Sequence, residues 1–327
     1  MQSLLDPAIL FFVFGVLAGA VKSNLEIPQP ISKFLSLYLL MALGLKGGFA
    51  LAQTPFDAQL FASLGAALVM AFVVPALGYQ VLKRHVAGFD AAATAAAYGS
   101  VSAVTFVTAI QVLETQGITA PGHMTVAMVL MESPAIVMAV LLASLLRARG
   151  ATAASGAAGV APAPVQLRSV LHEAFTDGTH LLLLGALAVG FISGEAGKAM
   201  MQPFTGDLFK GLLAFFLLDM GLLVARNFAT ARRQSPVLIG YAVLAPLVHA
   251  ALALGLAVLL SLPVADTALL MVLSASASYI VVPAVLRHAI PEANPSLYFG
   301  LSLGITFPLN ILVGIPLYLQ VAQWVRG

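Results

Sequence analysis

The chain has 327 residues, of which 61% are hydrophobic and only 9% are charged, against about 25% charged residues in an average soluble domain. This small number of polar groups could not cover the surface of a soluble protein of this size. Lipid must therefore be the solvent for most of the chain. The net charge of +2 without a basic run gives no support to nucleic-acid binding, and the lack of cysteine excludes disulfides and thiolate metal sites.

Ten apolar runs, bounded by charged residues, proline and glycine, have the length of roughly 17 to 25 residues that crosses a hydrocarbon core. The expected spans are residues 8–23, 31–51, 59–82, 90–112, 123–146, 179–197, 208–225, 236–260, 266–287 and 296–322. The last is expected to bend at Pro308 or Pro316. An Ala/Gly/Pro-rich stretch of low complexity, residues 151–164, separates the fifth span from the sixth. We therefore predict a five-helix repeat over residues 1–147, a cytoplasmic linker over 148–177, and a second five-helix repeat over 178–327.

The two halves carry matching sequence features in the same order. Residues 90–102 and 266–278 align so that Ser100 matches Ser276 and Ser102 matches Ser278. Further matches are Gly15-x-x-x-Gly19 with Gly190-x-x-x-Gly194, Met41–Leu45 with Asp219–Leu222, Pro75 with Pro246, and Pro134 with Pro308. The shared order predicts an internal duplication.

Charge predicts the orientation. All basic residues except Lys46, Lys198, Lys210 and Arg326 fall in, or at the edges of, the loops that follow the odd-numbered spans. The side richer in lysine and arginine is expected to be cytoplasmic, which places both termini outside and the linker inside. Because each half has an odd number of spans, the second half must be inverted relative to the first. The predicted fold is an all-α polytopic membrane protein of ten helices in two inverted repeats, with the fourth and ninth broken and crossing.

The matched serine segments, residues 97–102 and 274–278, are the expected helix breaks. Small, polar interruptions at corresponding places in two halves are typical of a secondary transporter's binding site. Two half-helix N-termini aimed at one point favour a small anion, and serine hydroxyls with freed carbonyls suit sodium. The alternative is that each serine only bonds back to its own helix.

Three more polar residues are candidates within the spans. Glu132, next to Pro134, is a candidate cation ligand or proton carrier, or else a cap where the helix restarts. Thr306 and Asn310 flank Pro308 and could complete a cation site or satisfy the kink. Motifs of hydrolases, nucleotide binding and zinc proteases are absent from the sequence, so no enzyme and no organic cofactor is expected.

Several motifs resemble the sodium-dependent bicarbonate transporter family of cyanobacteria and related bacteria. They are the run from Leu286 to Ser296, the run Phe307-Pro-Leu-Asn-Ile-Leu-Val-Gly-Ile-Pro-Leu317, Gly44-Leu-Lys-Gly-Gly48, Gly99-Ser-Val-Ser102, Val112-Leu-Glu114 and Glu132-Ser-Pro-Ala135. The resemblance implies ten helices in inverted repeats, a core and a gate domain, a homotrimer in the bacterial inner membrane, and sodium–bicarbonate symport by an elevator-like motion. It also implies a small PII-like cytoplasmic regulator, although the central loop that is longer and charged in cyanobacterial members is short here.

The resemblance and the positions of the two helix breaks together predict the site residues. The anion is expected between Gly99, Ser100, Val101, Ser102 and Ala103 on one side and Ser276, Ala277, Ser278 and Tyr279 on the other. Sodium is expected at Ser102, Thr105, Glu132, Ser278, Thr306 and Asn310. The chain departs from the family pattern at Tyr279, where an Asp is typical, at Val104, where a Ser is typical, and at Glu132, where the family's acidic residue is Asp.

Two other functions remain open at this stage. A sodium- or proton-coupled symporter of a small organic anion is one, because Tyr98, Phe106 and Tyr279 could line a more apolar pocket. A passive channel or a membrane interaction module, in which the breaks only serve packing, is the other.

Overall fold

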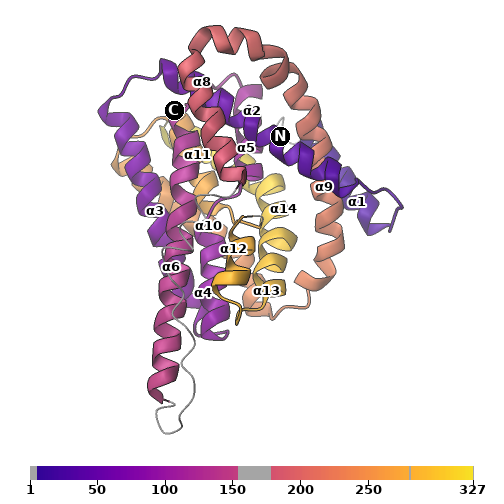
Figure 1. Ribbon diagram of the computed structural model, residues 1–327, viewed down its shortest axis with the longest axis vertical. Helices are drawn as coiled ribbons and strands as arrows, with labels where there is room; N and C mark the ends of the chain where they lie inside the picture. The colour runs from indigo at the N-terminus through magenta and orange to yellow at the C-terminus, as the bar shows by residue number, and fades with distance from the viewer. Residues whose placement is uncertain (1–5, 154–177, 280, 327) are drawn as a thin grey trace.

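The computed structural model describes residues 6–153, 178–279 and 281–326, and these are helical without a β-strand (Figure 1). The remainder of the expected linker, residues 154–177, lies outside the described residues. In the first half the helices are α1 (Pro7–Ala20), α2 (Gln29–Gln53), α3 (Ala58–Leu82), α4 (Gly88–Gly99), α5 (Ala103–Thr115) and α6 (His123–Ala153). In the second half they are α8 (Gly178–Gln202), η2 (Pro203–Asp207), α9 (Leu208–Ala231), α10 (Pro236–Leu259), α11 (Val264–Ala275), α12 (Val281–Ala289), α13 (Pro295–Leu301), η3 (Ser302–Thr306), α14 (Phe307–Leu309), η4 (Asn310–Gly314) and α15 (Ile315–Arg326).

Seven helical stretches of the described residues are long and apolar enough to cross a membrane. One of them, residues 181–231, joins α8, η2 and α9 and therefore contains two of the expected spans. Two more expected spans correspond to α1 and to α11, which are apolar but shorter. The described chain is thus a helical protein of the polytopic membrane class.

Local sequence explains where several helices begin and bend. Side-chain caps start α1 and α3, where Asp6 accepts from Ala8 N–H at 2.8 Å and Asp57 accepts from Leu60 N–H at 2.9 Å. Within α8, Gly194 adopts a positive φ of 55°, which a residue with a side chain rarely adopts. The last span, expected to bend at Pro308 or Pro316, contains the π-helical turns η3 and η4, each followed closely by a proline that cannot donate an N–H.

One group of helices consists of α1, α2, α8 and α9, which we call the outer group. Within it, α2 packs along α8 and α1 packs along α9 (Figure 1). Glycines allow both contacts: a Cβ on Gly15 would stand 3.1 Å from Gly221 Cα, and a Cβ on Gly190 would stand 3.1 Å from Gly48 Cα. Each pair therefore joins a helix of the first half to a helix of the second, through glycines on both sides.

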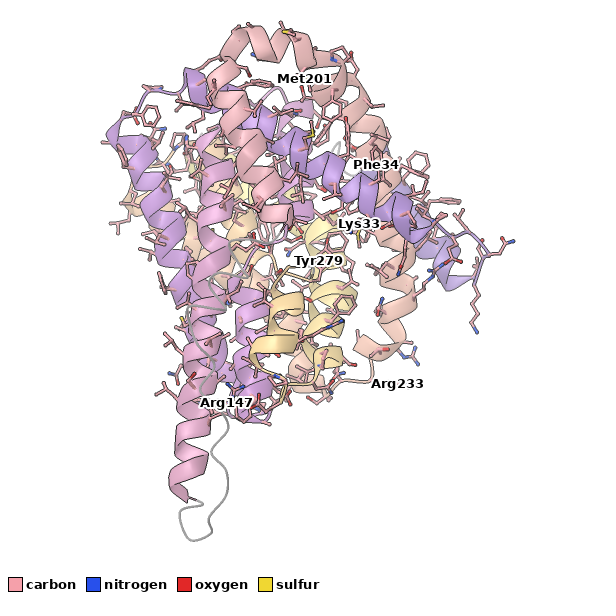
Figure 2. All side chains as sticks on the ribbon, viewed as in Figure 1. Lys33, Phe34, Arg147, Met201, Arg233 and Tyr279 are labelled. Carbon is pink, nitrogen blue, oxygen red and sulfur yellow. The ribbon has the colours of Figure 1, made fainter. Side chains whose placement is uncertain are left out.

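The other helices, α3–α6 and α10–α15, form what we call the inner group. Here α3 packs on α4 and α6, while α10 packs on α11. Every residue from 91 to 99 is buried, as is every residue from 266 to 275, so α4 and α11 are enclosed by protein on all sides. Large apolar side chains such as Phe61 on α3 and Leu244 on α10 are more than half exposed, as expected of faces solvated by lipid. Figure 2 shows Arg147 and Arg233 in the lower part of the view, Met201 at the top and Tyr279 between them.

Candidate substrate and sodium site

The site is built where two helix breaks meet. The chain leaves the helix at residues 100–102, between α4 and α5, and again from residue 276 to 279, between α11 and α12. The N–H of Ser278 donates to the carbonyl of Ala97 at 2.7 Å, and the N–H of Ser102 donates to Oγ of Ser276 at 2.9 Å. Each break thus satisfies backbone groups freed by the other, which is what a nonhelical segment within a membrane requires.

Each break contains a serine whose hydroxyl caps the first turn of the next helix. Oγ of Ser102 accepts from the N–H of Thr105 at 3.2 Å at the start of α5, and Oγ of Ser278 accepts from the N–H of Val282 at 3.3 Å at the start of α12. Free N–H groups and the positive end of the helix dipole gather at such N-termini and favour a negative charge.

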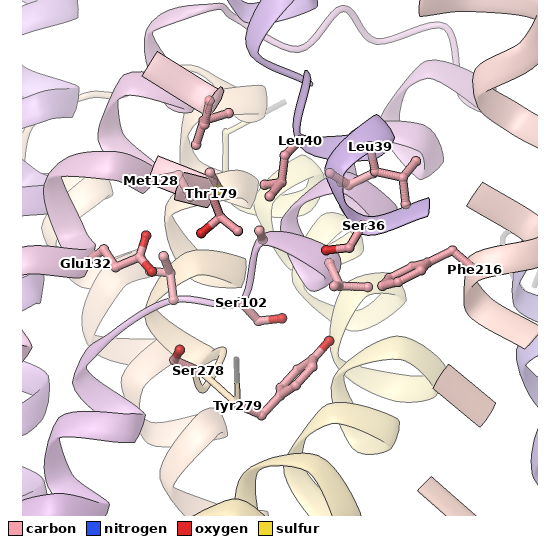
Figure 3. A pocket seen from close by; sticks show the side chains of 15 residues that line it. Ser36, Leu39, Leu40, Ser102, Met128, Glu132, Thr179, Phe216, Ser278 and Tyr279 are labelled. Carbon is pink, nitrogen blue, oxygen red and sulfur yellow. The ribbon is translucent and has the colours of Figure 1, made fainter. Parts of the chain in front are cut away.

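A cavity of about 60 Å³ lies beside these two serines (Figure 3). It is lined by Ser36, Leu39, Leu40, Val101, Ser102, Ala103, Val104, Val107, Met128, Glu132, Thr179, Leu183, Phe216, Ser278 and Tyr279. One water occupies roughly 10–15 Å³ of such space, so the cavity has room for about four to six water-sized groups. Its walls come from α2, α8 and α9 of the outer group and from α5, α6 and both breaks of the inner group, so it lies between the two groups.

Polar groups inside the cavity are few. Figure 3 shows the hydroxyls of Ser102 and Tyr279 near each other on one side of the cavity and the carboxylate of Glu132 on the opposite side, toward Thr179. The Tyr279 hydroxyl is buried next to the Ser102 hydroxyl but forms no hydrogen bond of standard geometry among the described residues. Oγ of Ser100 and Oγ1 of Thr105 are also buried without a hydrogen-bond partner among the described residues. Unpaired buried hydroxyls of this kind are available to a ligand.

The structure brings most of the expected anion residues together. Val101, Ser102, Ala103, Ser278 and Tyr279 line the cavity. The other expected anion residues, Gly99, Ser100, Ser276 and Ala277, are buried next to it within the two breaks and their flanking turns.

The expected sodium residues divide into two sets. Ser102, Glu132 and Ser278 line the cavity, and Thr105 is buried on the first turn of α5. Thr306 and Asn310 lie outside its lining and bond to other helices: Thr306 donates to Ala242 O at 2.8 Å, and Asn310 donates to Ala275 O at 2.8 Å. Neither of these bonds goes to a carbonyl at the Pro308 kink.

The outer group supplies lining residues that the sequence reading missed, among them Ser36, Thr179 and Phe216. They lie on long apolar helices in which a single serine, threonine or phenylalanine carries no pattern. No group of three or more histidine, aspartate or glutamate residues that could hold a metal ion occurs in the part of the chain that the structure describes. The atoms that could coordinate a metal ion here are hydroxyl and carbonyl oxygens and the carboxylate of Glu132. Such oxygen ligands fit a hard, singly charged cation.

The chain matches a known protein family. The family model of the Na+-dependent bicarbonate transporter superfamily matches residues 7–323, which confirms the resemblance inferred from the motifs. No curated protein matches the chain.

Proposed function

Because the chain belongs to the Na+-dependent bicarbonate transporter superfamily, we propose that it imports bicarbonate together with sodium by alternating access. Membership in a transporter family also implies that it is not an enzyme. The observation that carries the proposal is the crossing of the two breaks, which directs the N-termini of α5 and α12 to one cavity.

The anion occupies the cavity between Gly99–Ala103 and Ser276–Tyr279. Two helix N-termini offset its charge, and the hydroxyls of Ser102, Ser278 and Tyr279 are within the lining. The small volume supports a substrate of bicarbonate's size over a bulky organic anion.

Sodium binds beside the anion, with ligands drawn from Ser102, Thr105, Glu132 and Ser278. Each ion then lowers the cost of burying the other. Thr306 and Asn310 complete the region by holding α10 and α11 in place, and either can add a ligand if the cavity rearranges.

The chain folds as ten spans in two inverted repeats, over residues 1–147 and 178–327, joined by the linker over 148–177. The glycine contacts support this: Gly15 meets Gly221 as Gly190 meets Gly48. In these contacts Gly48 occupies the place in the first half that Gly221 occupies in the second. The sequence alignment instead pairs Gly221 with Gly44, which lies one helical turn before Gly48.

The location of the cavity supports an elevator-like movement of the inner group against the outer group. The charge bias supports an inner-membrane orientation with both termini outside and the linker cytoplasmic. A homotrimer and a PII-like regulator rest on the family resemblance alone.

A second candidate is a sodium- or proton-coupled symporter of a small carboxylate. Tyr279 favours it, because this buried aromatic residue lines the cavity where an Asp is typical of the family, and its ring packs on Phe307 at 5.1 Å between centroids.

Uptake of radiolabelled bicarbonate into proteoliposomes, with and without an inward sodium gradient, tests the proposal. We expect sodium-driven accumulation in the parent protein and its loss in Ser102→Ala and Ser278→Ala. Ser193→Ala is the matched control, because Ser193 is exposed on α8 and bonds only to carbonyls of its own helix. If bicarbonate does not accumulate but a small carboxylate does, the second candidate replaces the first. Unchanged sodium-driven uptake in both serine variants would rule out this site.

A further inference from the structure

A second and larger cavity lies between the two helix groups. Its volume is about 510 Å³, and Lys46, Lys198 and Lys210 all line it. These are three of the four basic residues that the charge bias assigns to the outside. We call this larger space the outer cavity and the space beside Ser102 and Ser278 the substrate cavity. Val107 on α5 lines both, so the two spaces are separated by little more than one layer of side chains.

One ion pair in the outer cavity joins the two groups. Nζ of Lys46 on α2 lies 2.6 Å from Oε1 of Glu114 on α5. Their side chains are 24% and 30% exposed, so the pair is only partly screened by water. Glu114 is about two helical turns beyond Val107 on the same short helix. A movement of Glu114 away from α2 therefore also moves Val107.

Lys46 has a second partner within its own group. Its ammonium group lies 4.7 Å from the ring centroid of Phe209 on α9, in a cation–π contact. If the two groups separate, Lys46 retains this contact while Glu114 faces the open cavity. Opening the pair therefore leaves neither charge buried and unpaired.

The Gly44-Leu-Lys-Gly-Gly48 motif explains how α2 serves both groups. Gly44 and Gly48 face α8, where a Cβ at either position would overlap the carbonyl of Leu183 or Leu187. Gly47 faces the inner group, where a Cβ would stand 2.6 Å from Oγ1 of Thr125. Lys46 reaches the inner group as well, so this motif forms the contact surface next to the ion pair.

We propose that the outer cavity is the entrance through which the anion reaches the substrate cavity, and that the Lys46–Glu114 ion pair is a gate that holds α5 against α2 and so keeps the wall at Val107 between the cavities closed. The proposal rests on the transport function proposed above. The remaining charges in or next to the cavity are Lys210, Asp207 and the pair of Lys198 with Glu195, which are 3.5 Å apart on α8. Both partners of that second pair belong to the outer group, so it cannot hold the groups together.

The test uses the lack of cysteine in the chain. Val107→Cys gives a single thiol in the wall between the cavities, and its rate of reaction with a membrane-impermeant thiol reagent is measured in intact cells and in inverted vesicles. Lys46→Gln and Glu114→Gln are each expected to raise the rate about two- to fivefold from the side of the outer cavity, the range for a partly exposed ion pair. The exchanged pair Lys46→Glu with Glu114→Lys is expected to return the rate toward that of the parent, and Lys198→Gln to leave it unchanged.

The gate is overturned if neither single variant reacts faster, if Lys198→Gln reacts as fast as they do, or if the exchanged pair stays as reactive as the single variants. Labelling requires neither sodium nor bicarbonate. If the single charge variants react faster but the parent protein takes up no bicarbonate, the gate is supported and bicarbonate is discarded as the substrate. If the parent takes up bicarbonate but the single variants are labelled at an unchanged rate, only the gate is discarded.

Discussion

Ser278 donates its backbone N–H to the carbonyl of Ala97 at 2.7 Å, which joins the second helix break to the last turn of the helix before the first break. The carbonyls at the end of a helix have no partner within it, and in a buried site an unpaired one costs about 1–3 kcal/mol. The two halves of the chain thus complete each other's backbone at the site, and neither break can form fully alone.

Ser276→Ala is expected to weaken this crossing. The substitution removes the acceptor of the Ser102 N–H at 2.9 Å and leaves that buried donor unpaired, so stability should fall by about 1–3 kcal/mol. Thermal unfolding in detergent measures the change. Ser302→Ala is the control, because buried Ser302 bonds only to carbonyls of the preceding turn. Equal melting temperatures for the two variants would contradict the role of Ser276.

Tyr279→Phe separates binding from folding. The hydroxyl that it removes is buried beside Ser102 and forms no hydrogen bond of standard geometry among the described residues, so the empty protein should be about as stable as the parent. A hydrogen bond to a charged ligand contributes about 1.5–3 kcal/mol, so the KM for the transported anion should rise by about tenfold or more. In the control Tyr38→Phe, which removes a donor to the carbonyl of Phe204 at a position that lines neither cavity, stability should fall while KM stays the same. A KM unchanged in Tyr279→Phe would exclude its hydroxyl from the site.

Gly48→Ala tests how closely α2 and α8 approach. The new methyl group would overlap the carbonyl of Leu187 and lie 2.7 Å from the N of Phe191, and such overpacking typically costs about 1–3 kcal/mol. Gly185→Ala on α8 is the matched control, since a Cβ there meets nothing within 4 Å and alanine favours a helix by up to about 1 kcal/mol. The two variants should shift the melting temperature in opposite directions, and a stabilised Gly48→Ala would show that the helices are farther apart.

The pH dependence of stability should include a contribution from Glu292. Arg147 donates from Nε and Nη2 to its two carboxylate oxygens, both at 2.7 Å, and this holds the pKa of the Glu292 carboxyl below its ordinary value. A carboxyl with a lowered folded-state pKa stabilises the protein above its unfolded pKa of about 4.3, and this stabilisation is lost as the pH falls through the folded pKa. Because the side chain is about one-third exposed, the contribution should not exceed about 1 kcal/mol. Melting curves between pH 3 and 7 should show a smaller acid-side loss in Glu292→Gln than in the parent, whereas a variant of the exposed Glu26, Glu26→Gln, should follow the parent.

The sequence allowed the helix breaks to be located but not their hydrogen bonds. Small and polar residues interrupt apolar runs at residues 97–102 and 274–278, and such interruptions have few structural explanations in a membrane. The repeat alignment pairs Ser102 with Ser278, yet the structure bonds Ser102 to Ser276. The hydrogen-bond partner of a residue in the other break depends on how far the two broken helices are shifted along each other. No local sequence pattern predicts that shift.

The outer-group wall of the cavity could not be predicted for a different reason. Ser36 and Phe216 lie on helices that are apolar around much of their circumference, so periodicity does not single out the face that meets the cavity. The motif around Lys46 and the motif ending in Glu114 were visible, but their ion pair follows only from the packing of α2 against α5.

The capping role of Ser102 and Ser278 limits what their hydroxyls can offer a ligand. A serine hydroxyl has one proton and two lone pairs, and in each residue one lone pair already accepts a backbone N–H. What remains on each oxygen is one proton, suited to an anion, and one lone pair, suited to a cation. A single atom can therefore serve both solutes at once, and binding of the cation polarises the O–H bond toward the anion, which links the two affinities without any movement of the chain.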